Sequence, residues 1–199
     1  MFITFEGPDG SGKSTQIKLF KEHLENKGFD VLLTREPGGT NIGNKIREII
    51  LDKENIEMSP ITEMFLYAAS RAQHVEEVIK PALEENKVVI CDRFLDSSIV
   101  YQGYARGLGN QVEEVNKFAV TNTLPDYTIL LMPGETEANN RVSDRGEKDR
   151  LELEKDDFRK KVYEGYKIIA ENNPERIILI EGNLTIEETF RRILEKINM

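Results

Sequence analysis

Short, continuous apolar runs alternate along this chain with longer segments in which apolar residues recur at helical spacing. Such runs are typical of strands in a parallel sheet covered on both faces, and the 3.6-residue spacing is typical of amphipathic helices. The expected strands are residues 2–6, 31–34, 88–92, 127–132 and 177–180. The expected helical segments are residues 13–27, 42–51, 61–79, 97–104, 112–121, 135–141 and 156–171, with a last helix from residue 186. The alternation predicts an α/β fold in which helices flank a five-stranded parallel sheet in three layers.

Residues at the helix ends support several of these boundaries. Gly28 follows the first helix, as is typical of a C′ glycine, and Ser59 with Pro60 makes an N-cap and first-turn pair. Residues 185–188, Thr-Ile-Glu-Glu, form the capping-box pattern at the start of the last helix. Pro81 is expected to kink or end the long third helix, because proline has no backbone N–H to donate.

A glycine-rich loop joins the first predicted strand to the first helix and fits the pattern G-x-x-x-x-G-K-[ST] without a gap. Its residues are Gly7, Pro8, Asp9, Gly10, Ser11, Gly12, Lys13 and Ser14, followed by Thr15. Glycines let backbone N–H groups approach phosphate oxygens, and the helix N-terminus adds orphan donors and a positive dipole end. Lys13 adds a point charge, and Ser14 offers a hydroxyl group to Mg²⁺. The alternative is a chance match, but the strand and helix on either side favour a P-loop.

Composition narrows the classes of function. At 199 residues the chain is expected to form a single domain, residues 1–199, with a core that needs no disulfide. The net charge of −9 argues against a general nucleic-acid surface and against binding to anionic membranes. There is one cysteine, no basic start of a signal peptide and no apolar run of membrane-spanning length. We therefore expect a cytoplasmic protein whose anion sites are local clusters of arginine and lysine.

Charged residues follow two predicted strands at the edge where the phosphate loop also lies. Ligands of open α/β sheets bind beyond the carboxyl ends of the strands, so Arg35, Asp92 and Arg93 are expected in one crevice. Asp92 can hold Mg²⁺ directly or through water, and the alternative is an acid that caps a turn. The two arginines suit bidentate phosphate binding and indicate a second phosphate-bearing substrate, unless each is an ordinary surface residue.

Three further features allow both a functional and a structural interpretation. Asp9 is repelled by phosphates, so it either accepts a hydrogen bond from a sugar hydroxyl group or lies on the solvent side of the loop. Residues 141–150 are polar and contain arginines, which favours a mobile lid over a solvated loop. Phe65 lies at helical spacing near Arg71, and sequence physics alone favours a place for it in the core.

Three other classes of function fit the sequence less well. A guanine-nucleotide switch needs Asn-Lys-x-Asp to read its base, and none of the Asn-Lys pairs here has aspartate two places on. A scaffold role leaves the arginines at the strand ends unexplained. A kinase for another nucleotide or for a nucleoside is a closer rival. A nucleoside acceptor needs a general base for its hydroxyl group, whereas Arg35 and Arg93 favour an acceptor that already carries a phosphate. These residues leave open which base that acceptor carries.

Taken in order, these motifs resemble those of the thymidylate kinase family over essentially the whole chain. Residues 5–15, Phe-Glu-Gly-Pro-Asp-Gly-Ser-Gly-Lys-Ser-Thr, resemble the opening of the family. Residues 34–40, Thr-Arg-Glu-Pro-Gly-Gly-Thr, resemble the segment after its second strand. Residues 92–94, Asp-Arg-Phe, resemble its Asp-Arg-aromatic motif, with phenylalanine where tyrosine or histidine is commoner. The match continues at Ser97, Ser98, residues 101–103 and, as the lid, residues 141–152.

The resemblance implies a site for the sugar and phosphate of dTMP beside the phosphate loop. It implies that Asp9 contacts the 3′-hydroxyl group and that Arg35 and Arg93 hold the phosphate. Pro37 would belong to the same site, and Tyr101 would lie against the sugar where a ribose carries its 2′-hydroxyl group.

The resemblance also implies how the base is bound. Phe65 would stack on thymine, contrary to the core interpretation, and Arg71 would donate a hydrogen bond to thymine O4. Ser98 and Gln102 would approach the edge of the base.

The implied reaction is transfer of the γ-phosphoryl group of MgATP to dTMP, which gives dTDP and ADP in dTTP biosynthesis. Lys13, Arg93 and a lid arginine would surround the transferring group. Residues 8–11 contain no arginine, so the chain resembles the bacterial class in which the lid supplies it. The candidates, in order of preference, are Arg145, Arg141 and Arg150. The acceptor phosphate has a second pKa of ~6, so it needs no general base. The family is usually homodimeric, which implies a homodimer here.

Overall fold

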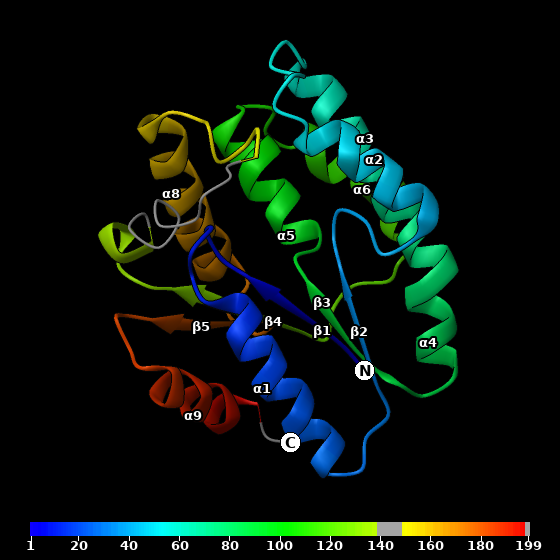
Figure 1. The fold of residues 1–199 in the computed structure, drawn as a ribbon, viewed down its shortest axis with the longest axis vertical. Helices are drawn as coiled ribbons and strands as arrows, with labels where there is room; N and C mark the ends of the chain where they lie inside the picture. The colour runs from blue at the N-terminus through cyan, green and yellow to red at the C-terminus, as the bar shows by residue number, and fades with distance from the viewer. Residues whose placement is uncertain (139–148, 198–199) are drawn as a thin grey trace.

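Parallel strands form the centre of the computed structural model, which describes residues 1–138 and 149–197 (Figure 1). The strands are β1 (Phe2–Glu6), β2 (Val31–Arg35), β3 (Val88–Asp92), β4 (Tyr127–Met132) and β5 (Ile177–Glu181). Their order across the sheet is β2-β3-β1-β4-β5, and all neighbouring pairs are parallel. The predicted five-stranded parallel sheet is confirmed, with strand boundaries that differ by at most one residue.

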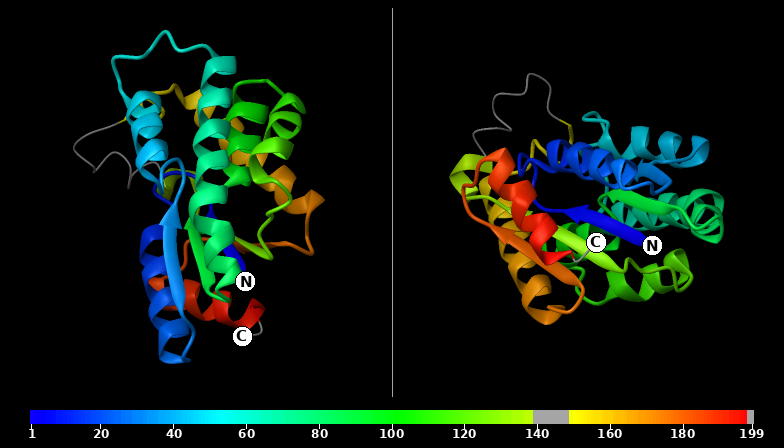
Figure 2. Two further views of the ribbon diagram at one scale, coloured as in Figure 1. Left: turned by 90° about the vertical axis from the view of Figure 1, so that its right-hand side faces the viewer. Right: turned by 90° about the horizontal axis from the view of Figure 1, so that it is seen from below.

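Helices connect the strands and cover both faces of the sheet (Figures 1 and 2). They are α1 (Lys13–Asn26), α2 (Asn41–Leu51), α3 (Pro60–His74), α4 (Lys80–Glu84), α5 (Leu95–Ser98), α6 (Gln111–Val120), α8 (Asp156–Asn172) and α9 (Ile186–Lys196), with π-helical segments η1 (Val75–Ile79) and η2 (Ile99–Ala105). Residues 135–138 are helical as expected, and the rest of that predicted helix lies outside the described residues. No helix among the residues that the structure describes is long and apolar enough to cross a membrane.

Two apolar layers hold the helices against the sheet. On one face α1 and α9 pack on the strands through buried side chains such as Phe20 and Ile193, which join Phe5 of β1 in one cluster. On the other face α8 and η2 cover β4, while η1 and α4 cover β1 and β3. The three-layer prediction is therefore confirmed, and the burial of large apolar side chains supplies most of the stability.

The second strand differs from its expectation. We expected it to be covered on both faces, but β2 lies at an edge of the sheet and Leu33 is 43% exposed. A continuous apolar run indicates a strand in a buried sheet. It does not indicate whether that strand lies at the centre or at the edge of the sheet, because strand order depends on contacts between distant parts of the chain.

The long third helix, expected to kink or end at Pro81, continues through η1 and α4 to Glu84. Pro81 neither ends it nor stands at a break, because η1 precedes α4 and the Lys80 N–H group donates to the Val75 carbonyl oxygen. The π-helical turn changes the bonding register one residue before the proline, where the missing donor would otherwise interrupt the ladder.

The predicted helix ends are confirmed where the structure describes them. The Ser59 hydroxyl group accepts from the Thr62 N–H group at 3.1 Å, and Gly28 has φ +89° after α1. Thr185 and Glu188 form the reciprocal capping box, with donor–acceptor distances of 2.9 and 3.1 Å.

Candidate active site

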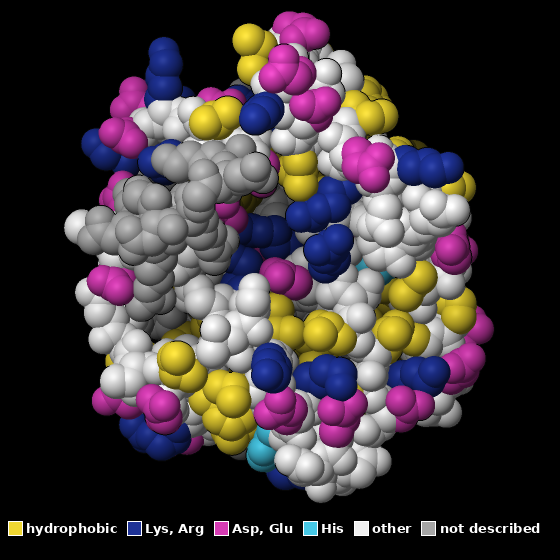
Figure 3. Space-filling model, in the orientation of Figure 1, with side chains coloured by type: hydrophobic (Ala, Val, Ile, Leu, Met, Phe, Trp, Pro, Cys, Tyr) yellow, Lys and Arg dark blue, Asp and Glu magenta, His cyan; other side chains and the backbone are white. Residues whose placement is uncertain are grey.

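A pocket of about 310 Å³ opens at the carboxyl ends of β1, β2 and β3. Figure 3 shows lysine and arginine side chains gathered in a hollow on this face. The pocket brings together the predicted residues Asp9, Gly10, Ser11, Gly12, Lys13, Ser14, Thr15, Arg35, Pro37, Arg71, Asp92, Arg93, Tyr101 and Gln102. The expectation that these motifs share one crevice is therefore met, although their individual roles stay predictions.

The phosphate loop needs glycine at two of its turns. Gly7 has φ +139°, and a Cβ atom there would lie 2.3 Å from the Leu131 carbonyl oxygen of β4. Gly12 has φ +91° and stands as the N-cap of α1, where a side chain would strain the backbone. The loop therefore brings its N–H groups and the start of α1 to one wall of the pocket.

Lys13 lies over this loop and is hydrogen-bonded to it. Its Nζ donates to the carbonyl oxygens of Gly7 and Pro8, each at 3.0 Å, and to Ser11 Oγ at 3.3 Å. Burial and the nearby Arg93 lower the pKa of Lys13 to about 8. An anion placed beside this ammonium group favours its charged form, so phosphate binding and protonation of Lys13 support each other.

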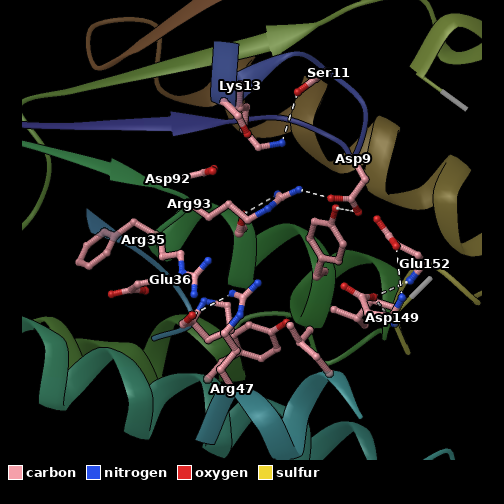
Figure 4. Close-up of a pocket in the computed structure, with 18 of the residues that line it drawn as sticks. Asp9, Ser11, Lys13, Arg35, Glu36, Arg47, Asp92, Arg93, Asp149 and Glu152 are labelled. Carbon is pink, nitrogen blue, oxygen red and sulfur yellow. Dashed lines mark hydrogen bonds and ion pairs between the residues drawn. The ribbon is translucent and has the colours of Figure 1, made fainter. Parts of the chain in front are cut away.

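Asp9, Arg93 and Tyr101 form a hydrogen-bonded group across the pocket (Figure 4). Arg93 Nη2 donates to Asp9 Oδ1 at 2.6 Å, and the Tyr101 hydroxyl group donates to Asp9 Oδ2 at 3.1 Å. Burial opposes ionisation of Asp9, but the charges of Arg93 and Lys13 hold its pKa below the usual value. A carboxylate engaged in this way faces the pocket, so the solvent-side interpretation of Asp9 is wrong.

Arg93 is held in an unusual backbone conformation by a buried carboxylate that the sequence argument missed. Arg93 has φ +68°, a region that costs a non-glycine residue energy unless its surroundings fix it. Glu6, which is fully buried, accepts from the N–H group of Phe94 at 2.7 Å and from Ser97 Oγ at 2.6 Å. Arg93 Nη1 in turn donates to Ser97 Oγ and to the hydroxyl group of Tyr166, at 3.1 and 3.0 Å.

The environment of Glu6 makes it an unusual acid. Burial and the nearby Asp96 raise the pKa of Glu6 to about 7, against the opposing charge of Arg93. In the sequence, Glu6 is recognisable only as an acid at the end of an apolar strand. That pattern does not show whether the side chain caps its own turn or, as here, accepts hydrogen bonds from the loop after β3.

Two arginines enter the pocket from the side opposite the phosphate loop. Arg35 ends β2, and Arg47 on α2 donates from Nη1 to the Pro37 carbonyl oxygen at 2.9 Å (Figure 4). Burial and the charge of Arg35 lower the pKa of Arg47. Arg47 was not predictable from the sequence, because the apolar spacing of α2 identifies its buried face and does not show where the opposite face points.

Asp92 is suited to a cation. Its Oδ1 atom is buried and has no hydrogen-bond partner among the described residues. Ser14, the other predicted Mg²⁺ ligand, is exposed in the same pocket. The described residues contain no group of three or more His, Cys, Asp or Glu side chains that could hold a metal ion. That is compatible with Mg²⁺, which proteins usually bind through one or two side chains together with substrate phosphates.

Arg71 is fixed by neighbours on three sides. It is 1% exposed, and its Nε donates to Glu36 Oε2 at 2.8 Å. Its Nη2 donates to the Phe94 carbonyl oxygen and to Ser98 Oγ, each at 3.0 Å, and its Nη1 donates to Asn116 Oδ1. A guanidinium group has five N–H bonds, so these contacts leave one on Nη1. Ser98 thus supports Arg71 from behind and does not line the pocket.

Gln102 presents an acceptor to the same region. Its Nε2 donates to Glu63 Oε1 at 2.8 Å, and its buried Oε1 has no partner among the described residues. Phe65, by contrast, is 55% exposed on α3 and does not line the pocket. The core interpretation of Phe65 is therefore wrong, and its stacking on thymine stays a prediction.

Arg150 lies apart from the pocket lining. It is 5% exposed, its Nη2 donates to Glu63 Oε2 at 2.6 Å, and its Nε donates to the Ile50 carbonyl oxygen at 2.8 Å. Its backbone N–H group donates to the Leu51 carbonyl oxygen, so the residue caps the end of α2. These contacts favour an anchoring role over the expected catalytic one. The other two lid candidates, Arg141 and Arg145, lie outside the described residues.

Several residues that line the pocket had no individual site role in the prediction from sequence. They are Glu36, Arg47, Leu51, Tyr67, Phe94, Ser97, Asp149, Leu151 and Glu152. Most of them stand one or four positions after a predicted site residue in the sequence. That spacing places two residues side by side on a loop or a helix, and it was the signal that could have identified them. Asp149 and Glu152 bring acidic side chains to the rim (Figure 4).

Comparison with known proteins identifies the family of this chain. The profile of the family described as thymidylate kinase matches residues 5–193. The chain is 50% identical to the thymidylate kinase of Exiguobacterium sp. over 188 residues, covering 94% of this chain and 89% of the relative. It is 52% identical to that of Thermoanaerobacter sp. over 195 residues, covering 98% and 95%. The crystal structure of thymidylate kinase from Ehrlichia chaffeensis superposes with a TM-score of 0.81 at 32% identity, covering 100% and 98%.

Relatives of about half-identical sequence span nearly the full length of the chain, and a solved structure of the family shares its fold. The chain therefore belongs to the thymidylate kinase family.

Proposed function

We propose that this chain transfers the γ-phosphoryl group of ATP to dTMP, giving dTDP and ADP, through residues of the pocket described above. The observation that carries the proposal is the convergence of Lys13, Arg35 and Arg93 on one pocket at the carboxyl edge of the sheet. Two phosphate-bearing substrates meeting there would face positive charge from both sides.

The acceptor phosphate is held by Arg35 and Arg93, with Arg47 as a third cation. Arg93 is suited to this because Ser97 and Tyr166 accept from its Nη1 and leave its plane fixed. Asp9 accepts from the 3′-hydroxyl group of the sugar. Tyr101 packs against the sugar, and Pro37 closes the site beside Arg35.

The base is recognised by two side chains of the pocket, Arg71 as a hydrogen-bond donor and Gln102 as an acceptor. The remaining N–H bond of Arg71 donates to thymine O4, and Gln102 Oε1 accepts from thymine N3–H. The unpaired acceptor on Gln102 supports this assignment, since a buried oxygen without a partner is costly and gains most from a ligand donor. Ser98 acts through Arg71. The expected stacking of Phe65 on the ring has no support from its position outside the pocket, so we assign the aromatic contact with the base to Tyr67, which lines the pocket on the same helix.

The donor phosphates are held by the loop from Gly7 to Thr15, by the N-terminus of α1 and by Lys13. Ser14 and Asp92 would hold Mg²⁺, which supplies charge neutralisation on the ATP phosphates when bound. A lid arginine, with Arg145 first and Arg141 second, stabilises the transferring group. The acceptor is largely a dianion at neutral pH, so positioning and charge stabilisation replace a general base.

The test is a kinetic comparison of Arg35→Ala with a matched surface change, Arg191→Ala. Losing one charged contact to the acceptor phosphate costs about 1.5–3 kcal/mol, so kcat/KM for dTMP should fall roughly 10- to 150-fold. The KM for ATP should stay near its wild-type value. Arg191 is exposed and paired with Glu195, so its loss should change neither constant. An equal fall for both substrates in Arg35→Ala would contradict the assignment.

Two further expectations rest on the family resemblance. A homodimer is expected, and exposed apolar side chains on three adjacent helices, Ile49 of α2, Ile61 of α3 and Phe118 of α6, agree with a covered surface. Light scattering after size-exclusion chromatography should give twice the chain mass of 22.8 kDa. Since ATP and dTMP are cytoplasmic metabolites, we assign the proposed reaction to the cytoplasm.

A further inference from the structure

The Gln102 amide meets an acid on one side and the acceptor pocket on the other. We propose that Glu63 determines the base preference of this site by fixing which end of the Gln102 amide faces the pocket. The inference rests on the proposed role of Gln102 as a reader of the base edge. Glu63 itself does not line the pocket, so it is a positioning residue that acts through Gln102.

The side chains of Gln102 and Glu63 are in direct contact. Gln102 is 1% exposed and Glu63 is 0% exposed, and they meet at 2.8 Å. An ionised carboxylate only accepts hydrogen bonds, so the atom of Gln102 that faces it must be the donating Nε2. The other atom, Oε1, is then directed away from Glu63 as a buried acceptor without a partner among the described residues.

Glu63 is held in its ionised state. Arg106 donates to it from Nη2 at 3.0 Å and from Nε at 3.3 Å, and Arg150 donates from Nη2 at 2.6 Å. Although burial opposes ionisation, the hydrogen bonds from Arg106 and Gln102 hold the pKa of Glu63 below its usual value. Glu63 therefore stays an acceptor across the working pH range and cannot turn the amide around by gaining a proton.

The orientation of the Gln102 amide has a consequence for the base. Thymine and uracil carry a donor at N3, which matches an acceptor in the pocket, whereas cytosine carries an acceptor there. With Oε1 in the pocket, cytosine would place two acceptors against each other in a buried site, which is a strongly unfavourable arrangement. A reversed amide would offer Nε2 to cytosine N3 instead. Glu63 thus selects against cytosine without touching the ligand.

Glu63→Gln should reverse this arrangement. The two closest arginine donors, Nη2 of Arg106 and Nη2 of Arg150, both meet Oε2 of Glu63. They would keep an oxygen at that position in the variant, because they outweigh the longer contact of Arg106 Nε with Oε1 at 3.3 Å. The nitrogen of the substituted amide would then lie where Oε1 of Glu63 meets Gln102. Gln102 would then turn its own oxygen toward residue 63 and its nitrogen toward the pocket.

The experiment is isothermal titration calorimetry of the full chain with dUMP and with dCMP. The two bases differ at position 3, which Gln102 reads, and at position 4, which Arg71 reads; the Arg71 mismatch with cytosine is common to wild type and variant, so a change in the ratio reports Gln102. We expect the dCMP:dUMP ratio of dissociation constants to fall at least about tenfold in Glu63→Gln, since one buried polar mismatch is exchanged for a match. The dTMP:dUMP ratio reports the methyl group and should not change. A purely structural role would weaken all three ligands by one factor and would overturn the inference.

Removing a buried charge can unfold the chain, so a charge-balanced pair of variants provides the matched control. Arg150→Met keeps the carboxylate and its Arg106 partner, and it should keep the wild-type dCMP:dUMP ratio. Glu63→Gln with Arg150→Met removes one charge of each sign, leaves Arg106 paired with Glu154, and should show the lowered ratio. Equal ratios in these two proteins would overturn the inference.

Gln102→Leu separates this inference from the proposed function. An unchanged dCMP:dUMP ratio in Gln102→Leu would mean that Gln102 does not read the base, so the proposed role itself fails. A changed ratio there, together with no change on replacing Glu63, would leave the role of Gln102 intact and refute the role of Glu63.

Discussion

Arg150→Met distinguishes an anchoring arginine from a catalytic one. Arg150 donates to Glu63 Oε2 at 2.6 Å and to the Ile50 carbonyl oxygen at 2.8 Å, and it is 5% exposed. Breaking a buried ion pair costs about 3–5 kcal/mol, and the lower end applies here because Glu63 keeps Arg106. We expect the free energy of unfolding to fall by about 3 kcal/mol, or the Tm by roughly 6–12 °C for a chain of this length.

Activity should respond very differently from stability. A transition-state arginine in phosphoryl transfer is worth about 10³- to 10⁵-fold in kcat, whereas an anchor should change kcat by only a few-fold. The assay pairs urea unfolding with kcat at saturating ATP and dTMP, measured well below the Tm of the variant. Arg159→Met is the control, because Arg159 is partly exposed and donates to the Glu152 carbonyl oxygen nearby. A kcat loss of about 10³ with unchanged stability would refute the anchoring role.

Three other predictions address the buried acid, the last helix and the metal site. Glu6 has a folded-state pKa of about 7 against a usual 4.5, so the stability from its protonated form is fully present below about pH 4.5 and is lost as the pH rises through 7. Wild type should therefore lose stability relative to Glu6→Gln between pH 5 and 8 in urea titrations, and a constant difference would contradict the burial argument. Thr185→Ala removes the capping box and should lower the free energy of unfolding by ~1 kcal/mol in thermal melts, with kcat unchanged; no loss of stability would count against the cap. Asp92→Asn should raise the Mg²⁺ concentration needed for half-maximal activity, and an unaltered Mg²⁺ titration would remove Asp92 from the metal site.

The fold was predictable because its signals are local. Continuous apolar runs, helix caps and the glycine loop each depend on a few neighbouring residues, and they located the five strands to within a residue. The position of β2 at the sheet edge was not predictable in this way, because strand order follows from which crossovers pack best over the whole chain.

The site was predictable where a motif fixes both residue type and place. Lys13, Arg35 and Arg93 lie together because parallel strands end at one edge of the sheet. Glu6 and Glu63 were not predictable, because their importance comes from partners 91 and 39 positions away, Ser97 and Gln102. Pairs at such separations leave no periodic trace in a single sequence.

The central claim, that dTMP is the acceptor, is tested most directly by a coupled assay of ADP formation. MgATP would be offered with dTMP, dUMP, UMP, CMP, AMP and GMP in parallel reactions. We expect turnover with dTMP, weaker turnover with dUMP and none above background with the others. Turnover with AMP or CMP but not with dTMP would contradict the interpretation of the base site, and ADP release that needs no acceptor would contradict the acceptor site altogether.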